Sequence, residues 1–278
     1  MIELVQRIKE FDGFLHLYQH DSEACGCTMS FTVYLPPQAA QGEVPVLWWL
    51  SGLTCTDENF RVKAGAQRYA AELGMALVIP DTSPRGVQVP DDVAYYLGQG
   101  AGFYVNATQP PWSRHFRMYD YITQELPAIL VSLQLPLMRD RQSIAGHSMG
   151  GHGALMVALN NPGQFCSASA FAPICHPTRS AWGSKILRTY LGEDQMAWQA
   201  YDACCLVRQG ATALPMRVDQ GTADEFYPQE LLTEALVAAC QARGIPADIR
   251  FQAGYDHSFH FVATFIGEHL RWHHRFLQ

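Results

Sequence analysis

Short apolar segments alternate along this chain with longer segments whose apolar residues recur at helical spacing. Residues 29–35 alternate apolar with other positions and stop at two prolines, and residues 46–50 form a continuous apolar run that ends in Ser51-Gly52. Both patterns predict strands, the second one buried on both faces. Further strands are expected at residues 75–81, 142–145, 167–171, 216–219 and 247–251.

Helices are predicted at residues 60–73, 118–133, 151–160 and from about residue 259 onward. The first should end at Gly74, and Pro127 must either kink the second or lie in a first turn. The long stretch from Thr82 to about Trp112 is rich in turn residues, and such segments are usually functional. Strands that alternate with helices predict an α/β fold with a mostly parallel sheet. No linker, repeat or low-complexity tract divides it, so one domain over 1–278 is expected.

Composition and charge exclude several classes of function. The chain is 48% hydrophobic and 16% charged, with a net charge of −7 and no basic run, which argues against nucleic acid as a partner. No apolar run is long enough to cross a bilayer and the N-terminal residues lack a secretory pattern, so we expect a soluble, cytoplasmic protein without a membrane partner. The eight cysteines lack zinc-site spacing and are expected to be free thiols.

The segment 146–150 matches G-x-S-x-G, with Ser148 as the candidate nucleophile. This pattern arises because a strand turns sharply into a helix and leaves the serine strained and exposed. The predicted strand before it and helix after it strengthen the match, although a glycine-rich turn with a structural serine is the alternative. The neighbouring His147 and His152 are expected to have packing or hydrogen-bonding roles.

A serine hydroxyl needs a base, and in this type of fold the acid and the histidine follow the serine along the chain. His257 lies in the loop after the last predicted strand and is the candidate base. The other histidines after Ser148 are less suitable: His176, His260 at the start of the last helix, and His269, His273 and His274, which we expect on the solvated surface of that helix.

The loop after the strand at 216–219 offers three acids. Asp219 still belongs to the strand, whereas Asp224 lies beyond the Gly221 turn and can reach back to the imidazole. We therefore favour Asp224 over Asp219 and Glu225 as the residue that orients the histidine.

The oxyanion hole of such a site combines the backbone N–H after the nucleophile with one from a loop after an early strand. These positions are Met149 and, within the loop 51–55, Leu53. A simple turn that requires Gly52 is the alternative reading of that loop.

With these residues placed, the chain as a whole resembles the S-formylglutathione hydrolases, also known as the esterase D family. The resemblance spans nearly the full length and rests on residues 49–55, 80–86, 98–104, 106–108, 146–153, 219–221 and 254–258. It implies an α/β-hydrolase fold, the triad Ser148, Asp224 and His257, and hydrolysis of S-formylglutathione to formate and glutathione. It also implies that the enzyme acts on a small-molecule substrate without a cofactor or metal. Members of the family are generally cytosolic and often homodimers, so the same is expected here. Val105 and the segment 175–179 depart from the family pattern.

Five residues are candidates for contact with the substrate. Cys55 would line the pocket or be a buried thiol, and Trp182 would wall it or lie in the core. Glutathione carries two carboxylates, which three cations could contact: Lys63, Arg85 and Lys185.

Four other functions remain open at this point. A broad short-chain carboxylesterase and an acyltransferase would use the same residues, and a catalytically silent binding module would keep the same fold. A metallohydrolase is disfavoured because the chain has no H-E-x-x-H motif.

Overall fold

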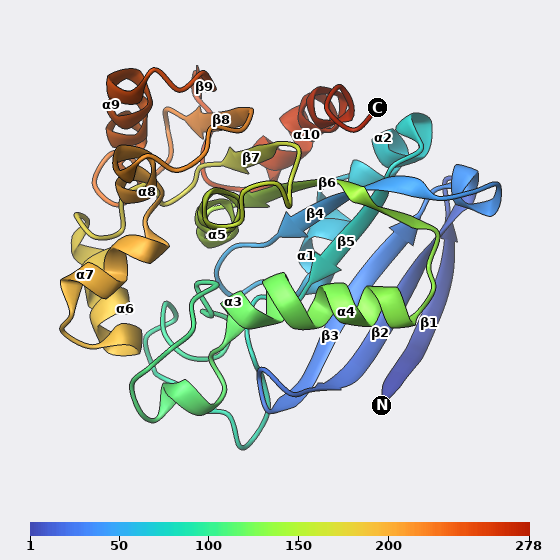
Figure 1. Cartoon of the computed structure of the whole chain (residues 1–278), viewed down its shortest axis with the longest axis horizontal. Coiled ribbons are helices and arrows are strands. Elements are labelled where there is room, and N and C mark those ends of the chain that lie inside the picture. Colours follow the sequence, from blue (N-terminus) through green and yellow to red (C-terminus); the bar gives the residue numbers. More distant parts are fainter.

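The computed structural model describes all 278 residues and is built on one nine-stranded sheet in the order β1-β2-β3-β5-β4-β6-β7-β8-β9 (Figure 1). The strands are β1 (Ile2–Glu10), β2 (Gly13–Ser22), β3 (Cys27–Leu35), β4 (Val44–Leu50), β5 (Ala76–Pro80), β6 (Leu137–His147), β7 (Ala168–Phe171), β8 (Met216–Gly221) and β9 (Ala247–Gln252). From β5 to β9 in this order neighbouring strands pair in parallel, whereas β1, β2 and β3 add an antiparallel edge. The predicted α/β architecture is confirmed.

Helices cover both faces of the sheet (Figure 1). On one face lie α1 (Asp57–Lys63), α2 (Ala66–Leu73) and α10 (Phe259–His274); on the other lie α3 (Met118–Asp120), α4 (Leu126–Ser132) and α5 (Met149–Asn160). Beyond α5 are α6 (Ala181–Leu191), α7 (Gln195–Trp198), α8 (Ala203–Gln209) and α9 (Thr233–Arg243). None of these helices combines the length and the apolar character that crossing a membrane requires.

Two predicted helices are interrupted. The helix expected at 60–73 is divided into α1 and α2 because Gly65 adopts a left-handed conformation, with φ of 64°. The helix expected at 118–133 contains a π-helical segment, η3 (Tyr121–Glu125), before α4. Pro127 then lies in the first turn of α4, directly after the π-helical segment, and the helical run continues past it to Ser132. Gly74 ends α2 as predicted.

The prediction that His269 and His273 are solvated is wrong, because the face of α10 that carries them lies against the sheet and both side chains are fully buried. His269 joins Ser169 Oγ to Asp219 Oδ2, at 2.9 and 3.0 Å. His273 lies between Ser167 and Ser169, at 2.7 Å from each hydroxyl oxygen. These contacts fix α10, and with it the loop that contains His257, to β7 and β8.

Burial of four histidines makes the stability of the fold dependent on pH. Burial lowers the pKa of His147, His269 and His273, and it lowers the pKa of His152 to about 4. In the unfolded chain the same groups take up protons below pH ~6.5, so unfolding binds protons there and the folded state loses stability as the pH falls. Each group contributes at most about 1.4 kcal/mol per pH unit.

We therefore expect the free energy of unfolding to decrease steadily from pH 7.5 to pH 5. Urea unfolding followed by tryptophan fluorescence at several pH values measures it. A free energy that stays constant or increases over this range would show that these histidines are protonated in the folded protein.

Candidate active site

The turn between β6 and α5 presents Ser148 in a strained conformation, with φ of 57° and ψ of −120°. A Cβ atom on Gly146 would lie 2.2 Å from the carbonyl oxygen of Gly150, and one on Gly150 would lie 1.9 Å from that of Leu50. Both contacts are impossible, so the two glycines of the motif are required for β6 to turn into α5. The strain leaves the Ser148 hydroxyl at the carboxyl end of the sheet.

Ser148, His257 and Asp224 form one hydrogen-bonded line. His257 Nε2 lies 2.8 Å from Ser148 Oγ, and His257 Nδ1 lies 2.6 Å from Asp224 Oδ2. The carboxylate of Asp224 is fully buried and also accepts hydrogen bonds from the Phe226 N–H and the Gln220 amide. Such a carboxylate holds the proton of a neutral imidazole on Nδ1 and leaves Nε2 free to accept the serine proton.

The loops that carry the acid and the base approach each other closely. A Cβ atom on Gly221, at the end of β8, would lie 2.3 Å from the carbonyl oxygen of Tyr255, in the loop that follows β9. The Ala223 N–H donates to the same carbonyl oxygen at 2.9 Å. This contact explains the glycine at position 221 and fixes the separation between Asp224 and His257.

Asp219, the alternative acid, lies elsewhere in the fold. Its carboxylate is paired with the Arg250 guanidinium, with Nε 2.6 Å from Oδ1, and with His269. Burial alone would raise the pKa of Asp219, but the hydrogen bonds from His269 and Arg250 outweigh burial and hold the pKa well below its ordinary value. Asp219 therefore fastens β8 to β9 and α10, as expected of a hydrogen-bonding residue, and Glu225 is exposed.

Two backbone N–H groups near Ser148 are the candidates for the oxyanion hole that the sequence predicts. Met149 is the first residue of α5, so its N–H has no acceptor within the helix. The Leu53 N–H makes no hydrogen bond within the protein. A Cβ atom on Gly52 would lie 3.1 Å from the Cβ atom of Ser148, so the loop that carries Leu53 borders the nucleophile directly.

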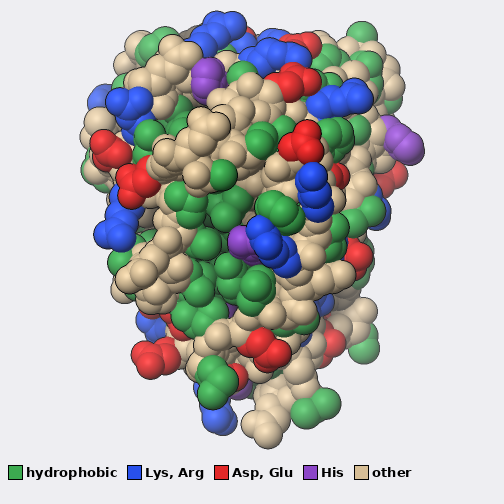
Figure 2. Space-filling model, turned by 90° about the vertical axis from the view of Figure 1, so that its right-hand side faces the viewer, with side chains coloured by type: hydrophobic (Ala, Val, Ile, Leu, Met, Phe, Trp, Pro, Cys, Tyr) green, Lys and Arg blue, Asp and Glu red, His purple; other side chains and the backbone are tan.

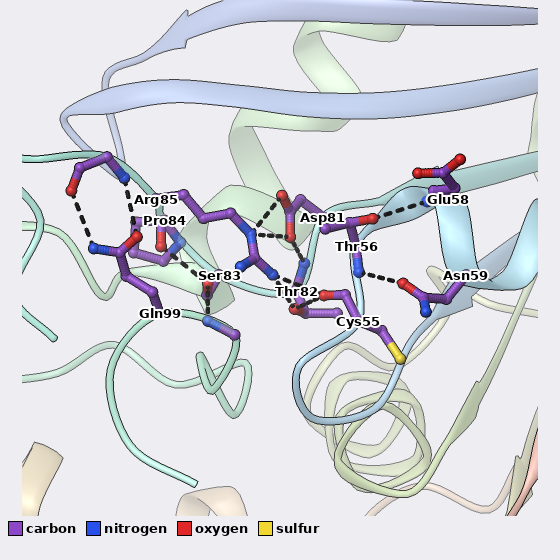
Figure 3. A network of polar contacts seen from close by, with 12 residues as sticks. Cys55, Thr56, Glu58, Asn59, Asp81, Thr82, Ser83, Pro84, Arg85 and Gln99 are labelled. Carbon is purple, nitrogen blue, oxygen red and sulfur yellow. Dashed lines mark hydrogen bonds and ion pairs between the residues drawn. The ribbon is translucent and has the colours of Figure 1, made fainter. Parts of the chain in front are cut away.

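A polar network supports this loop from behind (Figure 3). Arg85 Nη2 donates to the Cys55 carbonyl oxygen at 2.9 Å while its Nε bonds both oxygens of Asp81. The Thr82 hydroxyl donates to the same carbonyl oxygen. The guanidinium of Arg85 is thus committed to the loop and does not line the cavity at Ser148, which argues against the predicted contact of Arg85 with substrate.

A cavity of about 230 Å³ opens over the serine. Its lining consists of Gly52, Leu53, Thr54, Cys55, Tyr95, His147, Ser148, Trp182, Phe226, His257, Ser258 and Phe259. Cys55 and Trp182 therefore both line the cavity, which is one of the two alternatives that the sequence left open for each. Burial raises the pKa of the Cys55 thiol, which keeps it protonated and weakly nucleophilic.

Three aromatic residues of the lining were not singled out from the sequence. Phe226 packs edge-on against the His257 ring at 4.8 Å and stacks on Trp182 at 5.7 Å between centroids. Phe259 and Tyr95 complete the wall. Phe226 and Phe259 each follow a triad residue by two positions, a spacing that could have identified them.

His147 lines the same cavity and is buried, and neither of its ring nitrogens has a hydrogen-bond partner. Its ring centroid lies 4.7 Å from that of His257. Burial, followed by the nearby His257, holds the pKa of His147 well below its usual value, so the ring is a neutral wall of the site.

The two lysine candidates lie outside this cavity. Lys63, on α1, is exposed, and its Nζ lies 5.8 Å from the Phe259 ring centroid. Lys185, on α6, lines an adjoining groove that shares Trp182 and Phe226 with the cavity.

Comparison with known proteins identifies the family of the chain. A family model described as "Putative esterase" matches residues 22–272. The solved structure of an S-formylglutathione hydrolase from Agrobacterium tumefaciens is 45% identical, covers 99% of both chains and superposes with a TM-score of 0.96.

More distant structures share the fold alone. The fluorophosphonate-binding serine hydrolase F from Staphylococcus aureus is 20% identical, over 94% of this chain and 98% of that one, with a TM-score of 0.75. A ferulic acid esterase is 19% identical, over 96% and 100% of the two chains, with a TM-score of 0.72. The resemblance drawn from the sequence motifs is confirmed: this chain belongs to the esterase family, and within it to the S-formylglutathione hydrolases.

Proposed function

We propose that this enzyme hydrolyses S-formylglutathione to formate and glutathione through a formyl-enzyme on Ser148. The observation that carries the proposal is the 2.8 Å contact between Ser148 Oγ and His257 Nε2, with Asp224 behind the imidazole, beneath an aromatic-walled cavity. Membership of the S-formylglutathione hydrolases then selects the formyl thioester among the acyl compounds that such a site can cleave.

In the first half-reaction Ser148 Oγ attacks the thioester carbonyl carbon while its proton passes to His257 Nε2. Asp224 stabilises the imidazolium, and the Leu53 and Met149 N–H groups bind the tetrahedral oxyanion. The C–S bond then breaks and the sulfur leaves with the proton from His257. In the second half-reaction His257 takes a proton from water, the hydroxide attacks the formyl ester, and formate leaves as Ser148 regains its proton. No step requires a cofactor or metal.

A side-by-side assay of S-formylglutathione, S-acetylglutathione and a simple formate ester tests the substrate. We expect kcat/KM to be roughly a hundredfold higher, or more, for S-formylglutathione than for the formate ester, because only the thioester gains binding energy from the glutathione portion. Comparable values would favour a broad short-chain carboxylesterase. Transfer of the formyl group to an added alcohol in preference to water would favour an acyltransferase.

The reaction would complete thiol-dependent removal of formaldehyde, and we propose that it occurs in the cytoplasm. In support, all eight cysteines are free thiols, as expected in a reducing compartment. We also propose that residues 1–278 act as one domain, since one sheet with one continuous apolar core includes every strand.

A homodimer is a further part of the proposal. β1 is the edge strand of the sheet and exposes about half of Leu4 and Val5, at 48% and 51%. The side of the molecule on which β1 lies also shows a group of apolar side chains near its centre (Figure 2). Pairing of such edges between two copies would cover Leu4 and Val5, and a sedimentation coefficient typical of a monomer at micromolar concentration would contradict a dimer.

A further inference from the structure

The cavity over Ser148 continues into a shallower groove of about 400 Å³. The groove is lined by Tyr95, Tyr96, Ala181, Trp182, Lys185, Phe226 and Glu230. Because Tyr95, Trp182 and Phe226 border both hollows, the two form one continuous surface. A thioester held at Ser148 can therefore extend its thiol portion past Trp182 into the groove.

One cation and one anion lie along this groove. Lys185 Nζ is 2.7 Å from the Tyr96 hydroxyl and 5.0 Å from the centroid of the Tyr96 ring, so the tyrosine positions the ammonium group. Glu230 Oε2 accepts a hydrogen bond of 3.0 Å from the Trp182 N–H, which fixes the carboxylate at the beginning of α6. Both charged groups are thus held by neighbours that themselves line the groove.

Neither charge is neutralised by an ion pair within the protein. Lys185 and Glu230 take part in none of its salt bridges, whereas Arg188, also on α6, is paired with Glu193. Lys185 is the only cation and Glu230 the only acid among the residues that line the groove. The acids Asp92 and Glu225 lie near the groove without lining it. An aromatic groove with two unpaired, opposite charges is complementary to a zwitterion with an apolar stem.

We propose that this groove binds the γ-glutamyl end of glutathione, with Lys185 on its α-carboxylate and Glu230 on its α-ammonium group. This inference rests on the proposed function, since it names the part of S-formylglutathione that provides specificity. The γ-glutamyl residue carries both charges on one carbon at the end of a short methylene chain. Trp182 and Phe226 then pack against that chain, between the reacting thioester and the charged end.

Two substrate analogues separate the two contacts. S-formyl-glutaryl-cysteinylglycine lacks the α-ammonium group of S-formylglutathione, and S-formyl-(4-aminobutyryl)-cysteinylglycine lacks the α-carboxylate. Each variant should lose affinity only for substrates that carry the charge it recognises. The variant Lys185→Met keeps the unbranched apolar stem of the side chain and removes the charged group. The variant Glu230→Gln keeps the acceptor for the Trp182 N–H.

We expect Lys185→Met to raise KM for S-formylglutathione and for the glutaryl analogue by roughly three- to tenfold, with kcat unchanged. The aminobutyryl analogue should be unaffected. Glu230→Gln should show the reverse selectivity between the analogues. The matched control Arg188→Met, one turn further along α6, should leave KM and kcat for all three substrates unchanged.

Equal effects on both analogues, or none on S-formylglutathione, would overturn the assignment of these residues. A higher KM for S-formylglutathione in Lys63→Met alone would instead place the carboxylate site beside Phe259 and overturn the proposal. These outcomes are distinct from failure of the proposed function, in which wild-type enzyme itself would show no preference for S-formylglutathione over p-nitrophenyl acetate.

Discussion

Replacing Ser148 with alanine is expected to lower kcat/KM for S-formylglutathione by about 10⁵- to 10⁶-fold. The variant keeps His257, Asp224 and the two oxyanion N–H groups, but it has no atom that can form the acyl-enzyme. Alanine fits the turn between β6 and α5 without a clash, because the strain there comes from the backbone and the nearby glycines provide the space. What remains should be direct attack by water on the bound thioester.

The measurement is kcat/KM by release of thiol, together with urea unfolding to show that the fold is retained. Ser132→Ala, at the exposed end of α4, is the matched control and should behave as wild type. Residual activity above about one hundredth of the wild-type value would contradict a nucleophilic role for Ser148.

Asp224→Asn is expected to lower kcat by about 10⁴-fold while the protein stays folded. The amide can no longer hold the proton on His257 Nδ1, so the imidazole turns to the tautomer that cannot accept the proton of Ser148, and no carboxylate stabilises the imidazolium. The change is nearly isosteric, and the Phe226 N–H that bonds Asp224 Oδ1 keeps an oxygen acceptor.

Asp219→Asn is the matched comparison, since Asp219 is as deeply buried and lies five positions earlier. Its loss leaves His269 without its charged partner and leaves Arg250 paired with Glu268 alone, so we expect a stability decrease of about 3 kcal/mol with kcat nearly unchanged. Chemical denaturation and steady-state kinetics on both variants separate the two roles. The opposite pattern, with kcat lost in Asp219→Asn and kept in Asp224→Asn, would make Asp219 the acid.

The triad could be proposed from the sequence because its geometry follows from local rules. Ser148, Asp224 and His257 each lie in the turn or loop that follows a parallel strand, and parallel strands place their carboxyl ends at one edge of the sheet. The glycines at 146, 150 and 221 mark the close backbone approaches that bring these loops together. The usual order of serine, acid and histidine along the chain in this type of fold then assigned a role to each residue.

The features that were missed depend on contacts between distant parts of the chain. β1 lies at the edge of the sheet and most of its side chains are exposed, so its apolar residues show no burial pattern. Helical periodicity in α10 did not identify which face packs on the sheet, and His269 and His273 were therefore assigned to solvent. The break between α1 and α2 depends on one left-handed glycine that the spacing of apolar residues does not reveal.

The substrate groove was beyond sequence reasoning for the same reason. It joins Tyr95 and Tyr96 from the long irregular segment, Lys185 from α6, and Phe226 and Glu230 from the loop after β8. The sequence identifies Lys185 as one of three candidate cations for the carboxylates of the substrate, but only the fold places it in one groove wall with Glu230. The same fold turns Arg85 toward Asp81 and the oxyanion loop.

Covalent labelling of Ser148 by a fluorophosphonate tests the central claim most directly. Such a probe reacts with a serine hydroxyl only where a base has activated it and an oxyanion site receives the phosphonyl oxygen. We expect one adduct per chain, found by mass spectrometry on the peptide that contains Ser148, with loss of activity in proportion to labelling and no adduct in Ser148→Ala. A folded wild-type protein that stays unlabelled, or that is labelled at another residue while Ser148 is free, would contradict the account.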